Sequence, residues 1–560
     1  MTFVITQGCC NEASCVSVCP VNCIHPAPGE PGFTRAEMLY IDPETCIDCS
    51  ACVQVCPVDA IRAEEDLVGS QLQYLDINAK FYKQNPVATF GNRVQAKRAK
   101  VDARGLRVAV VGSGPAGSYA AAALLERPGV EVDLYERLLT PHGLIRFGIA
   151  PDHPKTKNVV TAFPYGSMRG LRLHLGVEVG VHISHEELLA RHHAVIYAVG
   201  ASGDRSLHIP GEDLSGSLSA TQFVAWYNGH PEQAGLPVDL SRCERAIVVG
   251  NGNVALDMAR ILLSDPDSLA STDIADHALH ALRASTVREV VLLARRGIAQ
   301  AACTTPELLA VLDLPGVDVV VEPAELVLDP LTAQLEARGG LDAATARKID
   351  IVRGLAARAA GSAVKRIVLR FLLSPIEVSG DGRVKAVRAV RNEFATDDGG
   401  QIRAAAGGES VEFPAQLVLR SIGYRGTAIP GLPFDERAGI IPNEAGRVWG
   451  ESGSMPGTYV TGWIKRGPTG VVGTNKHCAD ETVDALIEDW GAGRLSTPPH
   501  LGASVETLLA ERGALPLELA AWGRIDAAER AAGTRSGRPR VKFVNAADLV
   551  AAAKPRTDVA

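Results

Sequence analysis

Two stretches of the chain share one pattern, in which a short apolar run is followed at once by glycines and then by a helix rich in small and apolar residues. In the first stretch, residues 108–111 precede the loop GSGPAG and a predicted helix over residues 118–125. In the second, residues 246–249 precede GNGNVA and a predicted helix over residues 256–263. A buried strand, a glycine-rich turn and a helix in this order are typical of sheets that bind dinucleotides. The pattern therefore predicts two such α/β units.

The first loop contributes five residues to the turn: Gly112, Gly114, Pro115, Ala116 and Gly117. In G-x-G-x-x-G spacing the first glycine makes the tight turn, the second lets the backbone approach a pyrophosphate, and the third lets helix and strand pack closely. The phosphates then lie at the helix N-terminus, where unpaired N–H groups favour an anion. The next strand, residues 131–135, ends at Glu136, whose carboxylate can accept a hydrogen bond from a ribose 2′-OH and repels a 2′-phosphate. We interpret this loop as a flavin site.

The second loop contributes four residues in G-x-G-x-x-A form: Gly250, Gly252, Asn253 and Val254. The next strand, predicted over residues 289–293, is followed by Arg295 and Arg296 where an NAD site has an acid. Two guanidinium groups at this place can neutralise a ribose 2′-phosphate through charge-assisted hydrogen bonds. The second unit is therefore predicted to bind NADP(H).

The charge of the chain is concentrated at its N-terminal end. Residues 1–66 contain ten acids against Arg35 and Arg62, and this net charge of −8 equals that of the whole 560-residue chain. An acidic module argues against nucleic acid and suits a partner with a basic face. Residues 1–10 do not form a secretory signal and no apolar run has membrane-spanning length, so we expect a cytoplasmic protein without stable membrane insertion.

Cysteine is more uneven still, since nine of the twelve lie between residues 9 and 56. Without a secretory signal, such a cluster indicates bound metal rather than disulfides. The run CIDCSACVQVCP, residues 46–57, has the spacing of bacterial ferredoxins, in which the fourth cysteine ligates the other of two clusters. A zinc module is the alternative, but zinc sites prefer four ligands in two pairs.

The same spacing occurs 37 residues earlier, in CCNEASCVSVCP at residues 9–20, with Glu12 in place of the second cysteine. Exchanging the fourth cysteine between the two runs gives two sets of ligands. The set for a [4Fe–4S] cluster is Cys19, Cys46, Cys49 and Cys52. The other set is Cys9, Cys15 and Cys56. The second set is one thiolate short.

Residues 1–66 resemble the seven-iron bacterial ferredoxins, through these runs and the segments CPVNCIHP and MLYIDPETCIDCSACVQVCPVDAI. The resemblance implies an α+β ferredoxin module with one [4Fe–4S] and one [3Fe–4S] cluster. Two [4Fe–4S] clusters are the alternative, because Cys10 can replace Cys9 or supply a fourth ligand. Cys23 corresponds to a spare cysteine near the four-iron cluster and is expected not to be a ligand. Residues 67–104, basic in their later part, are interpreted as a linker.

Residues 105–560 resemble the adrenodoxin reductase family of ferredoxin–NADP reductases, through VGSGPAG, GLIRFGIAPDHPKTK, HIPGED, GNGNVALDMARILL, ARRG, FLLSPIEV and GWIKRGPTGVVGTNK. With the module in front, the whole chain is similar to actinobacterial fused ferredoxin/ferredoxin–NADP reductases. The resemblance implies an α/β flavoprotein with two dinucleotide-binding domains. Residues 105–242 are expected to bind FAD, residues 243–419 to bind NADP, and residues 420–560 to complete the FAD domain and form a C-terminal extension. The basic stretch 526–542 is expected to be a solvated tail.

The resemblance also implies further cofactor contacts. Beside FAD it places Glu136, Leu144, Val179, Trp463, Gly470, Val471 and Val472. Beside NADP it places Arg295, Arg296, Glu307 and Gly470. His153, in APDHP, matches a histidine near the flavin and is the candidate catalytic residue. Where relatives often have a second glutamate after Glu307, this chain has Ala310, which puts an acid–base or nicotinamide-orienting role at that position in doubt.

The three predicted cofactors together suggest a reaction. NADPH gives up two electrons as hydride and iron–sulfur clusters accept one at a time, so a flavin is needed to join them. We therefore expect electrons to pass from NADPH to FAD, to the N-terminal clusters, and on to a ferredoxin or a cytochrome P450-type acceptor. Two alternatives are an electron-input subunit like the small subunit of glutamate synthase, and a non-catalytic redox sensor that binds flavin and clusters.

Overall fold

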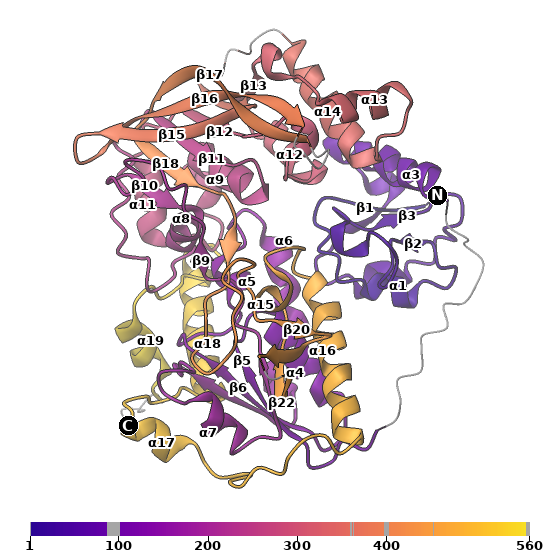
Figure 1. Ribbon diagram of the computed structural model, residues 1–560, viewed down its shortest axis with the longest axis vertical. Coiled ribbons are helices and arrows are strands. Elements are labelled where there is room, and N and C mark those ends of the chain that lie inside the picture. The colour runs from indigo at the N-terminus through magenta and orange to yellow at the C-terminus, as the bar shows by residue number, and fades with distance from the viewer. Residues whose placement is uncertain are drawn as a thin grey trace.

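The chain folds into an N-terminal module and two larger α/β units (Figure 1). The computed structural model describes residues 2–86, 101–358, 361, 363–396, 402–451 and 453–555. The predicted basic part of the linker falls mostly within residues 87–100, which lie outside the described residues. In the part of the chain that is described, no helix is both long enough and apolar enough to cross a membrane.

The N-terminal module is built from two similar halves. Its first elements are β1 (Phe3–Ile5), α1 (Ser14–Val18), β2 (Ile24–His25), β3 (Tyr40–Ile41), α2 (Ala51–Val55) and β4 (Ile61–Ala63). Strand β1 pairs antiparallel with β4, and β2 pairs antiparallel with β3. Each short helix starts after a residue in the left-handed conformation, Ala13 and Ser50, so each cysteine run curls tightly before its helix.

A third helix, α3 (Gln73–Gln84), completes this module. Its Asn78 side chain is buried, accepts a hydrogen bond from the backbone N of Ile41 at 2.9 Å and donates one to the carbonyl of Ile5 at 2.9 Å. The hydroxyl of Tyr82 donates to two further backbone carbonyls of the module at 2.8 Å. The prediction that a linker begins at residue 67 is therefore wrong, because the folded module continues to Gln84.

The first dinucleotide unit contains a seven-stranded sheet. Its strands, in spatial order, are β20 (Asn443–Glu444), β21 (Arg447–Gly450), β22 (Gly453–Val460), β8 (Ala194–Tyr197), β5 (Arg107–Val111), β6 (Glu131–Glu136) and β7 (Leu171–Leu175). Strands β22 to β7 are parallel, and β22 comes from a distant part of the chain to pair with β8. The helices of this unit are α4 (Pro115–Leu125), α5 (Leu144–Phe147), α6 (Pro154–Lys157), α7 (His185–Leu189), α15 (Trp463–Arg466) and α16 (Thr474–Gly491).

The second dinucleotide unit contains a six-stranded parallel sheet. Its strands, in spatial order, are β10 (Ser217–Ser219), β18 (Leu417–Arg420), β11 (Arg245–Val249), β12 (Glu289–Leu293), β14 (Lys365–Arg370) and β13 (Val317–Val321). An antiparallel sheet of β15 (Leu373–Gly380), β16 (Val384–Thr396) and β17 (Ile402–Pro414) extends from it. Its helices are α8 (Ala220–Tyr227), α9 (Asn253–Leu263), α10 (Pro266–Leu269), α11 (Asp276–Arg283), α12 (Thr305–Leu312), α13 (Pro330–Ala337) and α14 (Ala343–Ala356).

The chain crosses between the two units on a short antiparallel pair, β9 (Gly203–Asp204) with β19 (Tyr424–Arg425). Strand β10 and helix α8 come after the outward crossing, and β10 pairs with β18 at the edge of the second sheet. The second unit therefore begins near residue 203, and the predicted boundary at residue 243 is wrong. The cause is that a three-residue edge strand is recognisable only from its distant partner.

The C-terminal region consists of α17 (Glu506–Glu511), α18 (Leu519–Arg535) and α19 (Ala546–Ala553). The segment between α18 and α19 is not a solvated tail, so that prediction is wrong. The Lys542 side chain is fully buried, with its Nζ 2.9 Å from a carboxylate oxygen of Asp273 in the second unit. Arg538 likewise pairs with Asp276 of that unit, while Arg540 pairs with α18. Arg538 and Lys542 therefore tie the C-terminal region to the second unit.

Candidate functional site

The first glycine-rich loop has the geometry that a pyrophosphate requires. Gly112 lies in the left-handed region at φ 99°, and a Cβ there would lie 2.6 Å from the carbonyl oxygen of Ala198. A Cβ on Gly117 would lie 1.9 Å from the carbonyl oxygen of Gly112. Only glycine therefore fits either position. A Cβ on Gly114, which caps α4, would meet no atom within 4 Å, so the loop is open on that side and residues 114–116 fit an approaching phosphate.

Glu136 lies at the end of β6, directly beside this loop. One oxygen of its buried carboxylate accepts hydrogen bonds from the backbone N of Ser113 at 3.0 Å and from the Ser113 hydroxyl at 2.8 Å. The other oxygen accepts from the backbone N of Leu138 at 3.0 Å. These three donors fix the carboxylate at the place where the sequence predicts a ribose.

Two more of the predicted FAD neighbours, Leu144 and Trp463, each follow a glycine that packs against the same loop. Gly143 precedes Leu144, and a Cβ on Gly143 would lie 3.0 Å from the Cα of the second loop glycine. Gly462 precedes Trp463, and a Cβ on Gly462 would lie 2.6 Å from the Cβ of residue 116. The fold therefore brings Leu144 and Trp463 from opposite ends of the first unit to one place.

The remaining predicted FAD neighbours lie on two other segments. Gly470, at φ 78°, Val471 and Val472 lie in the loop before α16, and the indole N–H of Trp463 donates to the carbonyl of Thr469 in that loop at 3.1 Å. Val179 packs in the apolar core that includes residue 111, the last of β5. The aromatic side chain and the glycine-rich loop thus form one connected wall of the candidate flavin site.

The second loop has the same construction. Gly250 lies at φ 126°, and a Cβ there would lie 2.1 Å from the carbonyl oxygen of Ser421. Gly252 caps α9, and a Cβ on it would meet its nearest neighbour only at 3.8 Å. The side chain of Asn253 accepts a hydrogen bond from the backbone N of Thr304 at 2.8 Å. Val254 follows in the first turn of α9, so all four predicted loop residues surround the start of this helix.

Arg295 and Arg296 follow β12 at the same edge of the second sheet. Both side chains are exposed. Their backbone is held by the antiparallel sheet, because the side chain of Asn392 donates to the carbonyl of Arg295 at 2.8 Å. Among the described residues neither guanidinium group forms an ion pair, so both are available to a phosphate at the loop.

His153 lies where the two dinucleotide units meet. It caps α6 in the first unit, and its Nε2 is 3.4 Å from Asp257 and 3.6 Å from Glu307 in the second unit. The buried guanidinium of Arg260 lies in the same group, 2.7 Å from Asp257 and 3.2 Å from Glu307. Arg260 also pairs with Asp152 across the boundary at 2.5 Å. This group, named here the junction cluster, links the predicted catalytic histidine to the predicted NADP-contacting glutamate.

The junction cluster shifts the titration of its members. Burial lowers the pKa of His153, but its hydrogen bond to Asp257 and the nearby carboxylates outweigh this effect and raise that pKa above its ordinary value. Burial and the charge of Asp257 raise the pKa of Glu307. The His153, Asp257 and Glu307 side chains lie close enough together to hold a metal ion. Their two carboxylates, however, are already paired with the Arg260 cation.

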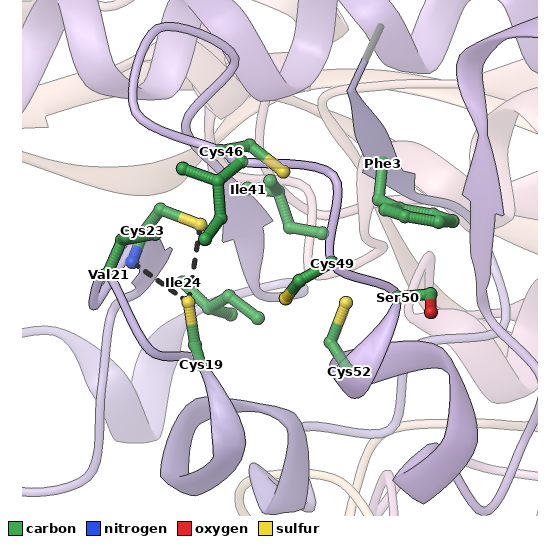
Figure 2. Close-up of a pocket in the computed structure, with 11 residues that line it drawn as sticks. Phe3, Cys19, Val21, Cys23, Ile24, Ile41, Cys46, Cys49, Ser50 and Cys52 are labelled. Carbon is green, nitrogen blue, oxygen red and sulfur yellow. Dashed lines mark hydrogen bonds between the residues drawn. The ribbon is translucent and has the colours of Figure 1, made fainter.

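One group of cysteines lines a pocket of the N-terminal module (Figure 2). The four predicted ligands Cys19, Cys46, Cys49 and Cys52 all line it, the first from the end of α1 and the others from the run around α2. Cys23 lines the same pocket, with its sulfur 3.4 Å from that of Cys19. Side-chain hydrogen bonding with Cys23 lowers the pKa of Cys19 to about 6 and that of Cys46 to about 5. Both therefore favour the thiolate form that binds metal.

The second group of cysteines, Cys9, Cys15 and Cys56, lies toward the first dinucleotide unit. The backbone N of Leu39 donates to the sulfur of Cys9 at 3.4 Å, and that of Ala60 donates to the sulfur of Cys56 at 3.3 Å. Burial and the proximity of Cys9 and Cys56 raise the pKa of Cys15. The structure therefore brings these three together, as the exchanged spacing predicts.

Cys10 and Glu12 lie beside this second group, at the contact with the first unit. Cys10 is buried, and its carbonyl accepts a hydrogen bond from the backbone N of Gly473 at 2.8 Å. Glu12 is also buried; one carboxylate oxygen lies 2.6 Å from the Nζ of Lys476 and the other accepts from the backbone N of Ser14 at 3.0 Å. Both oxygens at the position of the missing cysteine are thus already engaged.

Comparison with known proteins decides the identity of the chain. It is 48% identical over 567 residues to a probable ferredoxin/ferredoxin–NADP reductase of Mycobacterium leprae, with 99% of this chain and 98% of that protein covered. The chain belongs to the ferredoxin/ferredoxin–NADP reductase family. Residues 39–62 match the 4Fe-4S binding domain, and residues 106–303 match the pyridine nucleotide-disulphide oxidoreductase family.

Two further comparisons place the reductase part of this family member. The solved structure of Mycobacterium tuberculosis FprA in complex with NADPH is 48% identical, covers 80% of this chain and all of its own, and has a TM-score of 0.74. Human mitochondrial NADPH:adrenodoxin oxidoreductase is 42% identical over 454 residues, covering 79% of this chain and 91% of that protein. The predicted fold, a ferredoxin-like module followed by an adrenodoxin reductase-like flavoprotein, is confirmed.

The family assignment also settles the class of reaction. The chain is an NADPH-dependent oxidoreductase of the ferredoxin–NADP reductase class, with sites for FAD, NADP(H) and an iron–sulfur cluster. The predictions of enzyme class and family are therefore confirmed.

Several residues that join the parts of the molecule lie outside the predicted set. Arg260, Asp257 and Asp152 complete the junction cluster, and Lys476 and Gly473 contact the ferredoxin module. Asp257 and Arg260 lie within GNGNVALDMARILL and Lys476 within GWIKRGPTGVVGTNK, two motifs that carry the resemblance, so the motifs held a signal. The pairing partners, which come from other segments, could not be seen in the sequence.

Proposed function

We propose that this reductase takes electrons from NADPH and delivers them singly, through its own ferredoxin module, to a ferredoxin or a cytochrome P450-type acceptor. When bound, the flavin accepts electrons in pairs and releases them one at a time, and iron–sulfur clusters carry single electrons. The observation that carries the proposal is the direct contact of the module with the loop before α16. The carbonyl of Cys10 accepts a hydrogen bond from Gly473, one residue beyond the predicted flavin contacts.

The residues of the two loops hold and orient the nucleotides in this proposal. Residues 112–117 and Glu136 support FAD in the first unit, and residues 250–254 with Arg295 and Arg296 support NADP(H) in the second. His153 keeps a proton at its imidazole near Asp257 and Glu307 and positions the two units against each other. Hydride transfer needs the donor carbon and acceptor nitrogen about 3–3.5 Å apart, so this alignment is the main contribution of the chain.

We further propose a [4Fe–4S] cluster on Cys19, Cys46, Cys49 and Cys52, and a [3Fe–4S] cluster on Cys9, Cys15 and Cys56. The contacts of Glu12 with Lys476 and Ser14 support a second site with three thiolates, because each carboxylate oxygen already has a partner in the protein. Iron analysis and low-temperature EPR of the air-isolated protein test this proposal. We expect about seven irons and an oxidised three-iron signal. Eight irons without that signal would instead indicate two [4Fe–4S] clusters and make Cys10 the missing ligand.

The proposed partner is a protein with a basic face. Six acids within residues 1–66 of the module are exposed: Glu44, Asp48, Asp59, Glu64, Glu65 and Asp66. Exposed charges of one sign steer a partner of opposite sign, so the rate of acceptor reduction should fall as salt is added.

Anaerobic stopped-flow mixing of the full chain with NADPH tests the electron path. We expect rapid bleaching of flavin absorbance followed by bleaching in the iron–sulfur bands, and then reduction of added cytochrome c. A chain that bleaches its flavin but never its clusters contradicts the relay. If NADPH bleaches neither the flavin nor the clusters, the result contradicts reductase activity and favours the alternative of a non-catalytic redox sensor.

A further inference from the structure

The ferredoxin module contacts the first dinucleotide unit through Glu12. The side chain of Glu12 is 7% exposed, and the Nζ of Lys476 lies 2.6 Å from one of its oxygens and 3.1 Å from the hydroxyl of Ser14. A Cβ on Gly473 would lie 2.2 Å from the backbone N of Glu12, so the two backbones are in direct contact. Glu12 is the buried partner, while the Lys476 side chain is 32% exposed. Removing Lys476 is therefore costly mainly because the buried charge of Glu12 loses its compensation.

The module contacts the second dinucleotide unit through Glu37. One of its oxygens accepts a hydrogen bond from the backbone N of Thr305 at 3.0 Å, and the other lies 3.5 Å from the Nζ of Lys348. Thr305 is the first residue of α12, which carries Glu307 of the junction cluster. A carboxylate at this end of a helix is favoured by the helix dipole. Glu37 therefore fixes the module to the element that carries the predicted NADP contact.

The two cysteine groups differ in how close they lie to the reductase and in how exposed they are to solvent. Cys9 and Cys56 pack against the same apolar core as Tyr119 of α4 and Val472 of the candidate flavin wall. Cys49 of the other group is exposed, and its neighbour Ile47 is 58% exposed. Figure 1 shows the module lying against both units, with α3 near α14 and α1 near α16.

We propose that Glu12 and Glu37 form a clamp that holds the module with the Cys9, Cys15 and Cys56 group inward and Cys49 outward. Two more exposed ion pairs, Asp59 with Lys155 and Asp76 with Arg347, join the module to the two units beside the clamp. Glu12 and Glu37 are positioning residues, and Glu12 acts in this way in place of the cysteine that its position normally carries. The inference rests on the proposed function, since only a relay needs this orientation. It assigns the module a docked state, in which electrons leave the flavin unit at the inward group and reach an acceptor from the outward one.

The clamp is tested in the full chain with the variants Lys476→Met, Lys476→Arg and Glu37→Gln, and with Glu65→Gln as the control. Glu65 is an exposed acid of the same module that pairs with no described residue of the reductase. The first readout is amide hydrogen exchange in peptides covering residues 8–16, 303–310 and 470–478. The second compares NADPH oxidation by ferricyanide, which accepts electrons directly from flavin, with reduction of cytochrome c, which requires the module.

We expect Lys476→Met and Glu37→Gln each to speed amide exchange at their own contact at least tenfold and to slow cytochrome c reduction at least tenfold. Ferricyanide reduction should stay within twofold. Lys476→Arg keeps the charge and should restore at least half of the cytochrome c rate, while Glu65→Gln should behave as the wild type.

Three results would overturn the clamp. One is unchanged exchange and unchanged cytochrome c reduction in both clamp variants. Another is an equal fall of both activities, which would place the two residues in the flavin site instead. The third is loss of iron from a Glu12→Gln variant that keeps its FAD, which would make Glu12 a cluster ligand. A wild-type chain that reduces ferricyanide but never cytochrome c contradicts the proposed relay itself and not the clamp.

Discussion

The two glycine-rich loops share a backbone and differ in the side chains around it. In each, the first glycine lies against the residue just after the neighbouring parallel strand, Ala198 after β8 and Ser421 after β18. In each, the second glycine caps a helix and faces open space. The strand that follows ends in an engaged carboxylate in the first unit and in two exposed guanidinium groups in the second. We infer that the backbone of each loop binds a dinucleotide, and that the end of the next strand determines which dinucleotide binds.

The third small residue also differs between the loops, and this difference gives the largest predicted effect. A Cβ on Gly117 would lie 1.9 Å from a carbonyl oxygen of its own loop, whereas the second loop has Ala255 at the matching place. We expect Gly117→Ala to cost about 3 kcal/mol of stability and most of the bound FAD. Ala255→Gly should cost only about 0.5–1 kcal/mol, through backbone entropy. Thermal unfolding and FAD content measure both, and equal effects would show that the loops pack alike.

Replacement of the two arginines tests the selectivity of the second loop for NADPH over NADH. We expect Arg295→Ala combined with Arg296→Ala to raise the KM for NADPH about 100-fold, equivalent to about 2.7 kcal/mol. The KM for NADH should change less than threefold, since NADH has no 2′-phosphate for the guanidinium groups to bind. Steady-state kinetics with both nucleotides measure this. Equal losses for NADPH and NADH would contradict the assignment of the second loop to NADP.

The matching change in the first loop should have a smaller effect. Glu136→Gln removes a negative charge that accepts hydrogen bonds from Ser113 and Leu138, and leaves one of these donors without an acceptor. We expect the Kd for FAD to rise about tenfold, in line with a hydrogen bond to a charged group of about 1.5 kcal/mol. Titration of the FAD-free protein measures it. An unchanged affinity would mean that this carboxylate shapes the loop without contacting the nucleotide.

The junction cluster between the two loops should give the smallest effect, visible as a pH dependence. The pKa of His153 is raised in the folded protein, so its charge stabilises the fold below the unfolded value of about 6.5. This contribution is lost as the pH rises through the folded pKa. The Tm of the wild type should exceed that of His153→Gln by about 2 °C at pH 6, and the difference should vanish by pH 9. A Tm difference that does not depend on pH would assign His153 a packing role only.

The parts of the fold that could be predicted are those encoded in short, contiguous stretches. Both glycine loops and each cysteine run depend on spacing within about twenty residues, and the arginine pair directly follows an apolar run that predicts a strand. Helix α3 is also predictable from a contiguous stretch, because Tyr74, Asn78 and Phe81 are spaced so that they lie on one face of a helix. The prediction of a linker over residues 67–104 rests on their basic charge and does not use this helical spacing.

The parts that could not be predicted depend on pairing between distant segments. Lys542 lies in a basic run that predicts a solvated segment. It is buried because it pairs with Asp273, about 270 positions earlier in the chain. Arg260 similarly stands on an ordinary helix face, and its partner Asp152 belongs to the other unit. A buried charge is stable only with its partner, so no local pattern identifies it.

The central place of β22 governs how the chain can fold as it leaves the ribosome. Strands β5 and β8 are made early and pair with each other, but β22, which pairs with the other edge of β8, emerges only after the whole second unit. The second sheet is complete at Arg420, so it can fold before the first one closes. Until then one edge of β8 is unpaired, and an unpaired edge can pair with other nascent chains. Synthesis halted before Gly453 thus yields a chain with a finished second unit and an aggregation-prone first one.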